Sequence, residues 1–175
     1  MSVKKGFCDL GFAKIDTDRK KRKGFAEVIF CPGKDRRHLK EIAKKIIEKK
    51  EDLLLTKLDQ PTASFLKKAI PALKYSPLAK IGYLLAKPKN LSRGKVLVIS
   101  AGTSDIPIAE EAALTLEIMG NRVERLYDVG VAGVHRLMSN LEKLKSAQVI
   151  IVVAGMEGAN FWITFLLRSA IAELI

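Results

Sequence analysis

The residues best suited to chemistry stand in a short polar turn, residues 101–107, which reads Ala-Gly-Thr-Ser-Asp-Ile-Pro. It follows the continuous apolar run 96–99, which is typical of a buried parallel strand. Gly102 allows a tight turn, and Ser104 or Asp105 can cap the next helix, which alone would be a structural role. A strand, a polar turn and a helix N-terminus in this order predict a ligand site, where free backbone N–H groups favour an anion such as a phosphate.

Two further polar turns follow apolar runs of the same kind. The strand expected at residues 123–127 ends in residues 128–136, Asp-Val-Gly-Val-Ala-Gly-Val-His-Arg, which lead into a helix to about residue 144. The strand expected at residues 149–153 ends in residues 154–159, Ala-Gly-Met-Glu-Gly-Ala. Because crossovers between parallel strands are right-handed, all three turns fall on one edge of one sheet. The side chains expected to converge there are Ser104, Asp105, His135, Arg136 and Glu157.

Most of these side chains have both a chemical and a structural interpretation. Histidine is the side chain best suited to proton transfer at neutral pH, so His135 can transfer protons, or it is a solvated residue at a helix start. The planar fork of Arg136 suits a phosphate, or it pairs with an acid at the surface. Glu157, close to a buried strand, needs a partner or a catalytic role. Asp128 can orient His135, bind a hydroxyl group, or only close its turn.

Taken together, the three turns resemble the LarB family and, more distantly, the PurE family of aminoimidazole ribonucleotide carboxylases and mutases. Residues 16–30, Asp-Thr-Asp-Arg-Lys-Lys-Arg-Lys-Gly-Phe-Ala-Glu-Val-Ile-Phe, also resemble the N-terminal region of LarB-like proteins. The resemblance extends over about residues 10–159. It implies an α/β fold: a PurE-like, flavodoxin- or Rossmann-like, three-layer parallel-sheet domain, incomplete here, preceded by a small basic α/β module.

The resemblance also implies a reaction. LarB-like proteins are pyridinium-3,5-biscarboxylic acid mononucleotide synthases of nickel-pincer cofactor biosynthesis. They carboxylate the pyridinium ring of nicotinic acid adenine dinucleotide and hydrolyse its phosphoanhydride, which releases AMP. Carbon dioxide or bicarbonate is the co-substrate, no cofactor is implied as a requirement, and assistance by Mg²⁺ stays open with no ligands assigned. The alternative is a PurE-like carboxylation of an imidazole ribonucleotide in purine synthesis.

Carried over onto the matching positions, the resemblance implies two sets of site residues. The catalytic set is Ser104, Asp105, His135 and Glu157. The set that binds substrate or phosphate is Gly102, Thr103, Ser104, Arg136, Gly155 and Gly158. Carboxylation of a ring that carries a ribose phosphate needs a proton acceptor and a cation near the phosphate, and these residue types provide both.

The charge of the chain is uneven and predicts two modules. The 175 residues carry a net charge of +12. Residues 1–93 hold 24 Lys and Arg against 10 Asp and Glu, whereas residues 94–175 hold 7 against 9. A linker with Pro, Asn, Ser and Gly around residues 88–94 therefore separates a basic N-terminal α/β module, 1–93, from a nearly neutral sheet domain, 94–175.

The hydrophobic pattern also predicts the main elements. In the basic module these are a strand at 25–30, an amphipathic helix at 35–50, a strand at 53–56, a helix at 62–70 and one strand at 75–86. In the sheet domain, the helix after the first turn stops at Gly120.

The basic run 19–23, Arg-Lys-Lys-Arg-Lys, admits several interpretations. It suits a solvated face or disordered loop, or it steers a phosphorylated substrate. A polyanion- or nucleic-acid-binding module is the alternative function from another class. Since aromatic residues are not interleaved with these bases and no nucleic-acid motif is present, a nucleotide is the expected partner.

Other features narrow the class of protein. Cys8 and Cys31 show neither a CxxC pair nor metal-ligand spacing, as in a reduced cytoplasmic chain. No signal peptide is expected, and the apolar stretch 149–175 is interrupted by Glu157 and Arg168, so no membrane partner is expected. No G-x-G-x-x-G follows the first strand of the sheet domain, which argues against a nicotinamide-dependent dehydrogenase.

After Ala159 the sequence departs from the LarB pattern. Residues 160–168 read Asn-Phe-Trp-Ile-Thr-Phe-Leu-Leu-Arg, where the family has turn residues and, later, a nucleophilic cysteine. Neither cysteine of this chain matches that position, so no covalent nucleophile is assigned. An uncovered sheet edge tends to pair with another chain, so we expect a homo-oligomer, as in LarB-like and PurE-like proteins. If the polypeptide ends at Ile175, we also expect nucleotide binding without turnover of nicotinic acid adenine dinucleotide, because the family's late cysteine is then absent.

Overall fold

The computed structural model describes residues 6–16, 19–88, 93–130 and 133–155. The chain forms two compact units, residues 1–88 and residues 89–175, and the described part of each unit has hydrophobic clusters of its own. Within the described ranges, the helices are all too short or too polar to span a bilayer.

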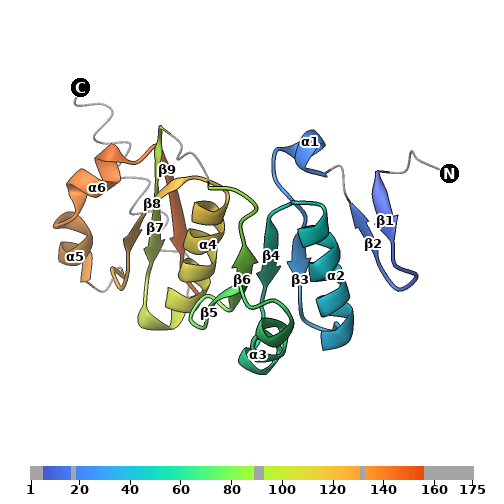
Figure 1. Ribbon diagram of the computed structural model, residues 1–175. Coiled ribbons are helices and arrows are strands. Elements are labelled where there is room, and N and C mark those ends of the chain that lie inside the picture. Colours follow the sequence, from blue (N-terminus) through green and yellow to red (C-terminus); the bar gives the residue numbers. More distant parts are fainter. Residues whose placement is uncertain (1–5, 17–18, 89–92, 131–132, 156–175) are drawn as a thin grey trace. The chain divides into compact units, whose positions relative to one another are not determined.

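A four-stranded mixed sheet forms the centre of the N-terminal unit (Figure 1). Its strands, in spatial order, are β3 (Val28–Phe30), β4 (Leu53–Thr56), β6 (Ile81–Leu84) and β5 (Lys74–Ser76). β3 and β4 are parallel, and the other pairs are antiparallel. The helices are α1 (Arg19–Lys23), α2 (Arg36–Glu48) and α3 (Gln60–Ala69), and a hairpin of β1 (Phe7–Asp9) and β2 (Lys14–Asp16) precedes them.

The core of this unit lies between the sheet and its two long helices. The apolar stripe of α2, including Leu39 and Ile42, packs with Leu53 and Leu55 of β4 and with Leu66 of α3. This stripe is the one that the 3.6-residue periodicity predicts, so the helix expected at 35–50 is confirmed.

Three parts of the N-terminal unit differ from the prediction. The single strand expected at 75–86 is two antiparallel strands, because Pro77 and the left-handed residue Lys80 lie in the turn between them. The strand expected at 25–30 is shorter, 28–30. The hairpin of β1 and β2 was missed, since runs of three residues are too short to show a period.

A parallel three-stranded sheet forms the centre of the C-terminal unit. Its strands are β7 (Lys95–Ser100), β8 (Arg122–Leu126) and β9 (Val149–Val153), in the order β8-β7-β9. The connections are the short 3₁₀ turn η1 (Thr103–Asp105) with α4 (Ile106–Ile118), and then α5 (Val134–Met138) with α6 (Leu141–Ser146). All three strands expected from the sequence are confirmed, as is the helix stop at Gly120, whose φ is +93°.

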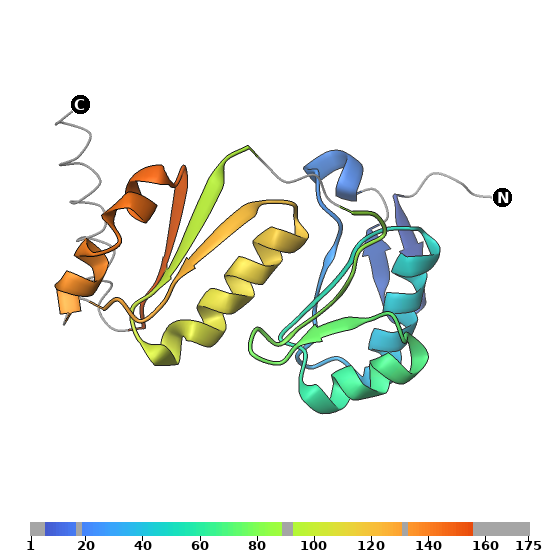
Figure 2. The same cartoon turned by 60° about the vertical axis from the view of Figure 1, so that its left-hand side comes forward.

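Helices cover both faces of this sheet, as Figure 2 shows. Leu97 of β7 belongs to one cluster with Leu137 of α5 and Leu144 of α6. The next residue, Val98, points to the opposite face and packs with Ala113 of α4. The central strand is therefore buried on both sides, which confirms the three-layer α/β fold predicted from its continuous apolar run.

The helix expected to run to about residue 144 is instead two short helices. Between them, Ser139 Oγ donates to the carbonyl of His135 at 2.8 Å, and Asn140 Nδ2 donates to the carbonyl of Arg136 at 2.9 Å. Side chains that hydrogen-bond the preceding turn compete with the helical pattern and favour an end at this point. The helix still begins where the sequence predicts, because α5 starts within residues 128–136 that form the second polar turn.

Candidate functional site

The order β8-β7-β9 places a topological switch point between β7 and β9. The chain leaves β7 through α4 on one face of the sheet and returns to β9 through α5 and α6 on the other. In open α/β sheets, ligands bind where successive connections leave in opposite directions. A ligand site is therefore expected at the turns that follow β7 and β9.

Asp105 joins these two turns. One carboxylate oxygen accepts a hydrogen bond from the backbone N–H of Gly102 at 3.0 Å, and the other accepts one from the N–H of Gly155 at 3.1 Å. A Cβ atom on Gly155 would lie only 3.2 Å from the Asp105 oxygen, so the close approach favours glycine. Asp105 thus fixes the end of β7 against the end of β9, across 50 residues of sequence.

This arrangement differs from the helix cap and the free anion site expected from the sequence. The Asp105 side chain makes no cap hydrogen bond with α4, because both oxygens are turned toward the glycines. The N–H groups of Gly102 and Gly155 are therefore occupied by a carboxylate. Thr103 and Ser104, in the 3₁₀ turn, are exposed beside this carboxylate. A substrate would reach their hydroxyl groups before it reached the glycine N–H groups.

The turn after β8 is attached to the same end of β7 through Ser100, whose side chain is fully buried. Ser100 Oγ accepts from the backbone N–H of Asp128 at 3.0 Å, and its carbonyl accepts from the N–H of Val129 at 3.2 Å. A Cβ atom on Gly130 would lie 2.9 Å from the carbonyl oxygen of Ala101. These contacts hold the second polar turn against the first.

Arg136 and Asp128 form an ion pair at this edge. Arg136 NH1 donates to Asp128 Oδ2 at 2.8 Å, and both side chains are about half exposed. Asp128 adopts a left-handed backbone conformation, φ +58°, which is uncommon for residues other than glycine. Gly133 lies beneath the guanidinium, since a Cβ atom there would come within 2.5 Å of Arg136 Nε. The carboxylate that the sequence offered as a partner of His135 therefore holds Arg136 in place.

The predicted site residues thus fall into two groups at one sheet edge. The first group is Gly102, Thr103, Ser104, Asp105 and Gly155; the second is Asp128, His135 and Arg136. His135 is exposed near the start of α5. Glu157 and Gly158, together with the apolar tail from residue 160, lie outside the described residues.

Ser100, which links the two groups, was not among the residues predicted from the sequence. Its signal was a polar residue directly after the apolar run 96–99, at the carboxyl end of the strand, and burial gives that hydroxyl group a need for a partner. The two cysteines lie elsewhere, in the N-terminal unit. Burial raises the pKa of the Cys31 thiol to about 12, so it is protonated and unreactive at neutral pH.

The residues present offer acids, hydroxyls, an imidazole and a guanidinium, and no cluster of metal-ligating side chains is found in the described parts of the chain. These groups lie at the topological switch point of a three-layer parallel sheet, the place where open α/β sheets bind their ligands. A mixed α/β unit with a parallel β3-α2-β4 crossover precedes it in the chain.

Comparison with known proteins gives a family match for the N-terminal unit. Residues 7–86 match the family described as the LarB/PurE-like N-terminal domain. This match confirms the resemblance to the LarB family over the N-terminal unit, which holds the motif at residues 16–30, whereas the three polar turns lie beyond the matched residues. The chain is also 40% identical, over 172 aligned residues, to the uncharacterized protein MJ0165 of Methanocaldococcus jannaschii. That alignment includes 93% of this chain and spans 64% of the length of the relative.

Proposed function

We propose that the carboxyl edge of the β8-β7-β9 sheet carboxylates the pyridinium ring of nicotinic acid adenine dinucleotide and hydrolyses its phosphoanhydride. Carbon dioxide or bicarbonate is the co-substrate. Carboxylation replaces a ring C–H bond with a C–C bond and releases a proton, and hydrolysis consumes water and releases AMP. The observation that carries the proposal is the Asp105 carboxylate, which lies at the switch point between the Gly102 and Gly155 turns.

Two N–H groups orient the Asp105 carboxylate while leaving lone pairs on each oxygen for a further contact. In the proposed reaction, Asp105 and His135 accept or return protons, and the Ser104 and Thr103 hydroxyls hold the substrate. Glu157, assigned by the LarB resemblance, acts as acid or base in the hydrolysis.

Arg136 is proposed to bind a substrate phosphate without leaving Asp128. Its ion pair uses the NH1 nitrogen, and a guanidinium carries five N–H donors in a planar fork. Asp128 therefore acts as a positioning residue that presents the rest of the fork to the substrate. The same geometry suits an imidazole ribonucleotide. A PurE-like carboxylase or mutase reaction on that substrate is therefore the second candidate, supported by the match to the LarB/PurE-like N-terminal domain.

The basic run does not favour the polyanion-binding alternative. It forms α1, where Arg22 pairs with Asp16 and Lys20 pairs with Asp52 at 3.4 Å. Arg19 lies over the ring of Phe25, 5.2 Å from its centroid. Much of this charge is therefore used within the unit, and a homo-oligomer that binds a nucleotide remains the proposed assembly.

The test is to incubate the chain with nicotinic acid adenine dinucleotide and ¹³C-bicarbonate, and to follow AMP and the labelled ring product by mass spectrometry. Binding of nicotinate mononucleotide is measured in parallel by calorimetry at low salt. We expect His135→Asn to abolish ring carboxylation in any full-length form of the protein with little loss of stability, because the side chain is exposed.

Arg136 gives the sharper binding test. We expect Arg136→Ala to weaken binding by about tenfold or more, and Arg136→Lys to weaken it less, because lysine keeps the charge but loses the fork. Glu142→Gln, at a side chain that is 93% exposed, serves as the control and should match the parent chain. Equal affinities of the Ala and Lys variants, or unchanged turnover in His135→Asn, would contradict the proposal.

A further inference from the structure

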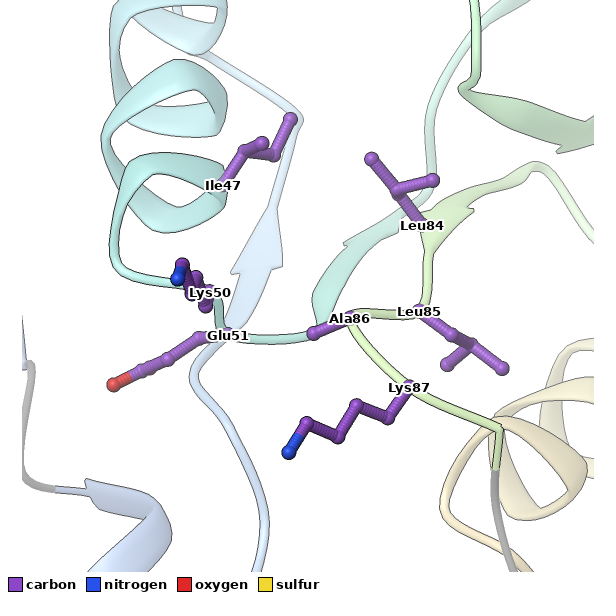
Figure 3. A pocket seen from close by; sticks show the side chains of 7 residues that line it. All are labelled: Ile47, Lys50, Glu51, Leu84, Leu85, Ala86 and Lys87. Carbon is purple, nitrogen blue, oxygen red and sulfur yellow. The ribbon is translucent and has the colours of Figure 1, made fainter.

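A pocket of about 250 Å³ opens in the N-terminal unit. It lies between the end of α2 and the segment that follows β6 (Figure 3). Its lining residues are Ile47, Lys50, Glu51, Leu84, Leu85, Ala86 and Lys87. This volume suits a molecule the size of one or two rings, since pockets for drug-sized ligands begin at about 300 Å³.

One side of the pocket is apolar. Ile47 and Leu84 are half-buried and pack against the core of the unit, and Figure 3 shows them projecting into the space between α2 and β6. Leu85 extends this apolar surface. Such a surface is complementary to the face of a flat ring.

The other side carries charge. Lys50 and Lys87 are exposed, and neither ammonium group has an ion-pair partner among the described residues. Lys20 and Lys45, in contrast, pair with Asp52 and Glu48. With Glu51 as the acidic member, the lining has two cations and one anion, which favours a ligand of negative charge.

A buried carboxylate fixes the shape of this pocket. Asp52 is 6% exposed, and its oxygen Oδ1 accepts from the backbone N–H of Ala86 at 3.0 Å, while Oδ2 contacts Lys20 at 3.4 Å. The segment that carries Leu85 and Lys87 is thus tied to the strand start beside Glu51. The pocket is therefore formed before any ligand arrives, which lowers the entropic cost of binding.

Lys50 stands where a helix usually places glycine. The N–H of Lys50 donates to the carbonyl of Ile47 at 2.9 Å, and the N–H of Glu51 donates to the carbonyl of Ile46 at 3.3 Å, which together form a Schellman helix end. The φ of Lys50 is +57°, a conformation that disfavours residues with a Cβ atom. Lys57 and Lys80 share this conformation outside the pocket, so it is the place of Lys50 in the lining that suggests a role for its side chain.

We propose that this pocket binds a small molecule that combines a flat apolar ring with a phosphate or carboxylate group. The ring lies against Ile47, Leu84 and Leu85, and the anionic group contacts the ammonium groups of Lys50 and Lys87. The proposal rests on the N-terminal unit alone and is independent of the reaction proposed for the sheet edge.

The test uses the whole chain with labelled isoleucine and leucine methyl groups, titrated with AMP as the probe of matching chemistry. Adenosine and inorganic phosphate, which carry only one of the two features, are titrated separately. We expect AMP to shift the methyl signals of Ile47, Leu84 and Leu85, and each partial probe to bind at least about tenfold more weakly. AMP bound only at the sheet edge would shift methyl signals such as that of Leu137 instead, and would overturn this proposal while leaving the proposed function intact.

Lys50→Gly distinguishes a loss of binding from a loss of stability, because we expect it to weaken AMP binding while it stabilises the fold. We expect the substitution to weaken AMP binding at the Ile47 methyl by about tenfold, because one charged contact is lost. The melting temperature should rise by roughly 2–6 °C, because glycine relieves the left-handed backbone. Lys80→Gly is the matched control: it has φ +50° and an exposed side chain outside the pocket, and should leave AMP binding unchanged. Unchanged AMP affinity in Lys50→Gly would overturn the proposal.

Discussion

Among the described residues, an aspartate directly precedes α2, α3 and α4, and the two units use that aspartate differently. In the N-terminal unit, Asp35 accepts from the N–H of Arg37 and Asp59 from the N–H of Thr62, each at 2.7 Å, so each caps its own helix. In the C-terminal unit, Asp105 precedes α4 but gives its oxygens to two strand turns. The same residue type at the same position thus serves local stability in one unit and the assembly of a site in the other.

The glycines of the two units also differ in what they pack against. A Cβ atom on Gly82, in the N-terminal sheet, would meet the side chains of Leu58 and Leu55, so this glycine serves the packing of the core. A Cβ atom on Gly130 would meet the backbone of the β7 turn, and one on Gly133 would meet the guanidinium of Arg136. In the C-terminal unit, glycines therefore bring polar groups together at the sheet edge.

The strongest test of this comparison exchanges the two aspartates for asparagine. Asp105→Asn keeps one acceptor and turns an NH₂ group toward a backbone N–H, so one of the two cross-turn hydrogen bonds is lost. We expect a loss of roughly 1–3 kcal/mol in the free energy of unfolding. Any turnover at the sheet edge should fall by about 100-fold, because the turns no longer hold their geometry. Urea denaturation and the AMP assay measure the two effects.

Asp59→Asn is the matched control, because asparagine is an equally good helix cap. It should leave turnover unchanged and alter the free energy of unfolding far less. If the two asparagine variants behaved alike, Asp105 would be an ordinary cap, and the distinction between the units would fail.

The sequence predicts the elements of the C-terminal unit better than the contacts at its edge. A continuous apolar run identifies each buried strand, because the residues of β7 go into cores on both faces. The right-handed crossover rule then brings the three turns together without any knowledge of side-chain positions. The direction in which Asp105 points depends on Gly155, 50 residues away, and no local pattern contains that information.

The same limit explains the other differences. The pairing of Arg136 with Asp128 depends on a left-handed backbone at Asp128, which neither its residue type nor its neighbours require. The role of Ser100 follows from its burial, and burial is a property of the folded sheet. Short strands such as β1 and β2 are fixed by their pairing and not by a periodic pattern, so they too were missed.

With Asp105 turned away, α4 is held to the sheet by a charged network at its side. Arg125 of β8 donates to both oxygens of Glu110, at 2.9 and 3.1 Å, and also to Glu117, while Tyr127 OH donates to Glu110 at 2.5 Å. Burial acts to raise the pKa of Glu110, but the hydrogen bonds and the charge of Arg125 outweigh it and hold this pKa below its ordinary value. Burial and the hydrogen bond to Glu110 raise the pKa of Tyr127.

Glu110→Gln therefore tests whether the ion pair of Glu110 with Arg125 stabilises α4, whose N-terminus has no side-chain cap. A lowered pKa contributes stability that is present above the unfolded value of 4.5 and is lost as pH falls through the folded value. We expect the variant to lose roughly 1 kcal/mol at pH 7, discounted for partial exposure, and to show a flatter decline of stability below about pH 4.5. Urea denaturation at pH 7 and pH 3 measures this, and a decline parallel to that of the parent chain would contradict it.

The smallest effect belongs to the aspartate that caps its own helix. Hydrogen bonds from the backbone N–H and the side chain of Thr62 lower the pKa of Asp59. Asp59→Ala removes these acceptors from the start of α3 and should lower the free energy of unfolding by about 1 kcal/mol at pH 7, whereas Asp59→Asn should lower it by only a few tenths. Because the Asp59 pKa is lowered, the advantage of aspartate is present above its ordinary value and fades as pH falls through the folded value. Turnover at the sheet edge should be unchanged in both variants, and a fall in turnover without a fall in stability would show that the N-terminal unit contributes to the reaction through this residue.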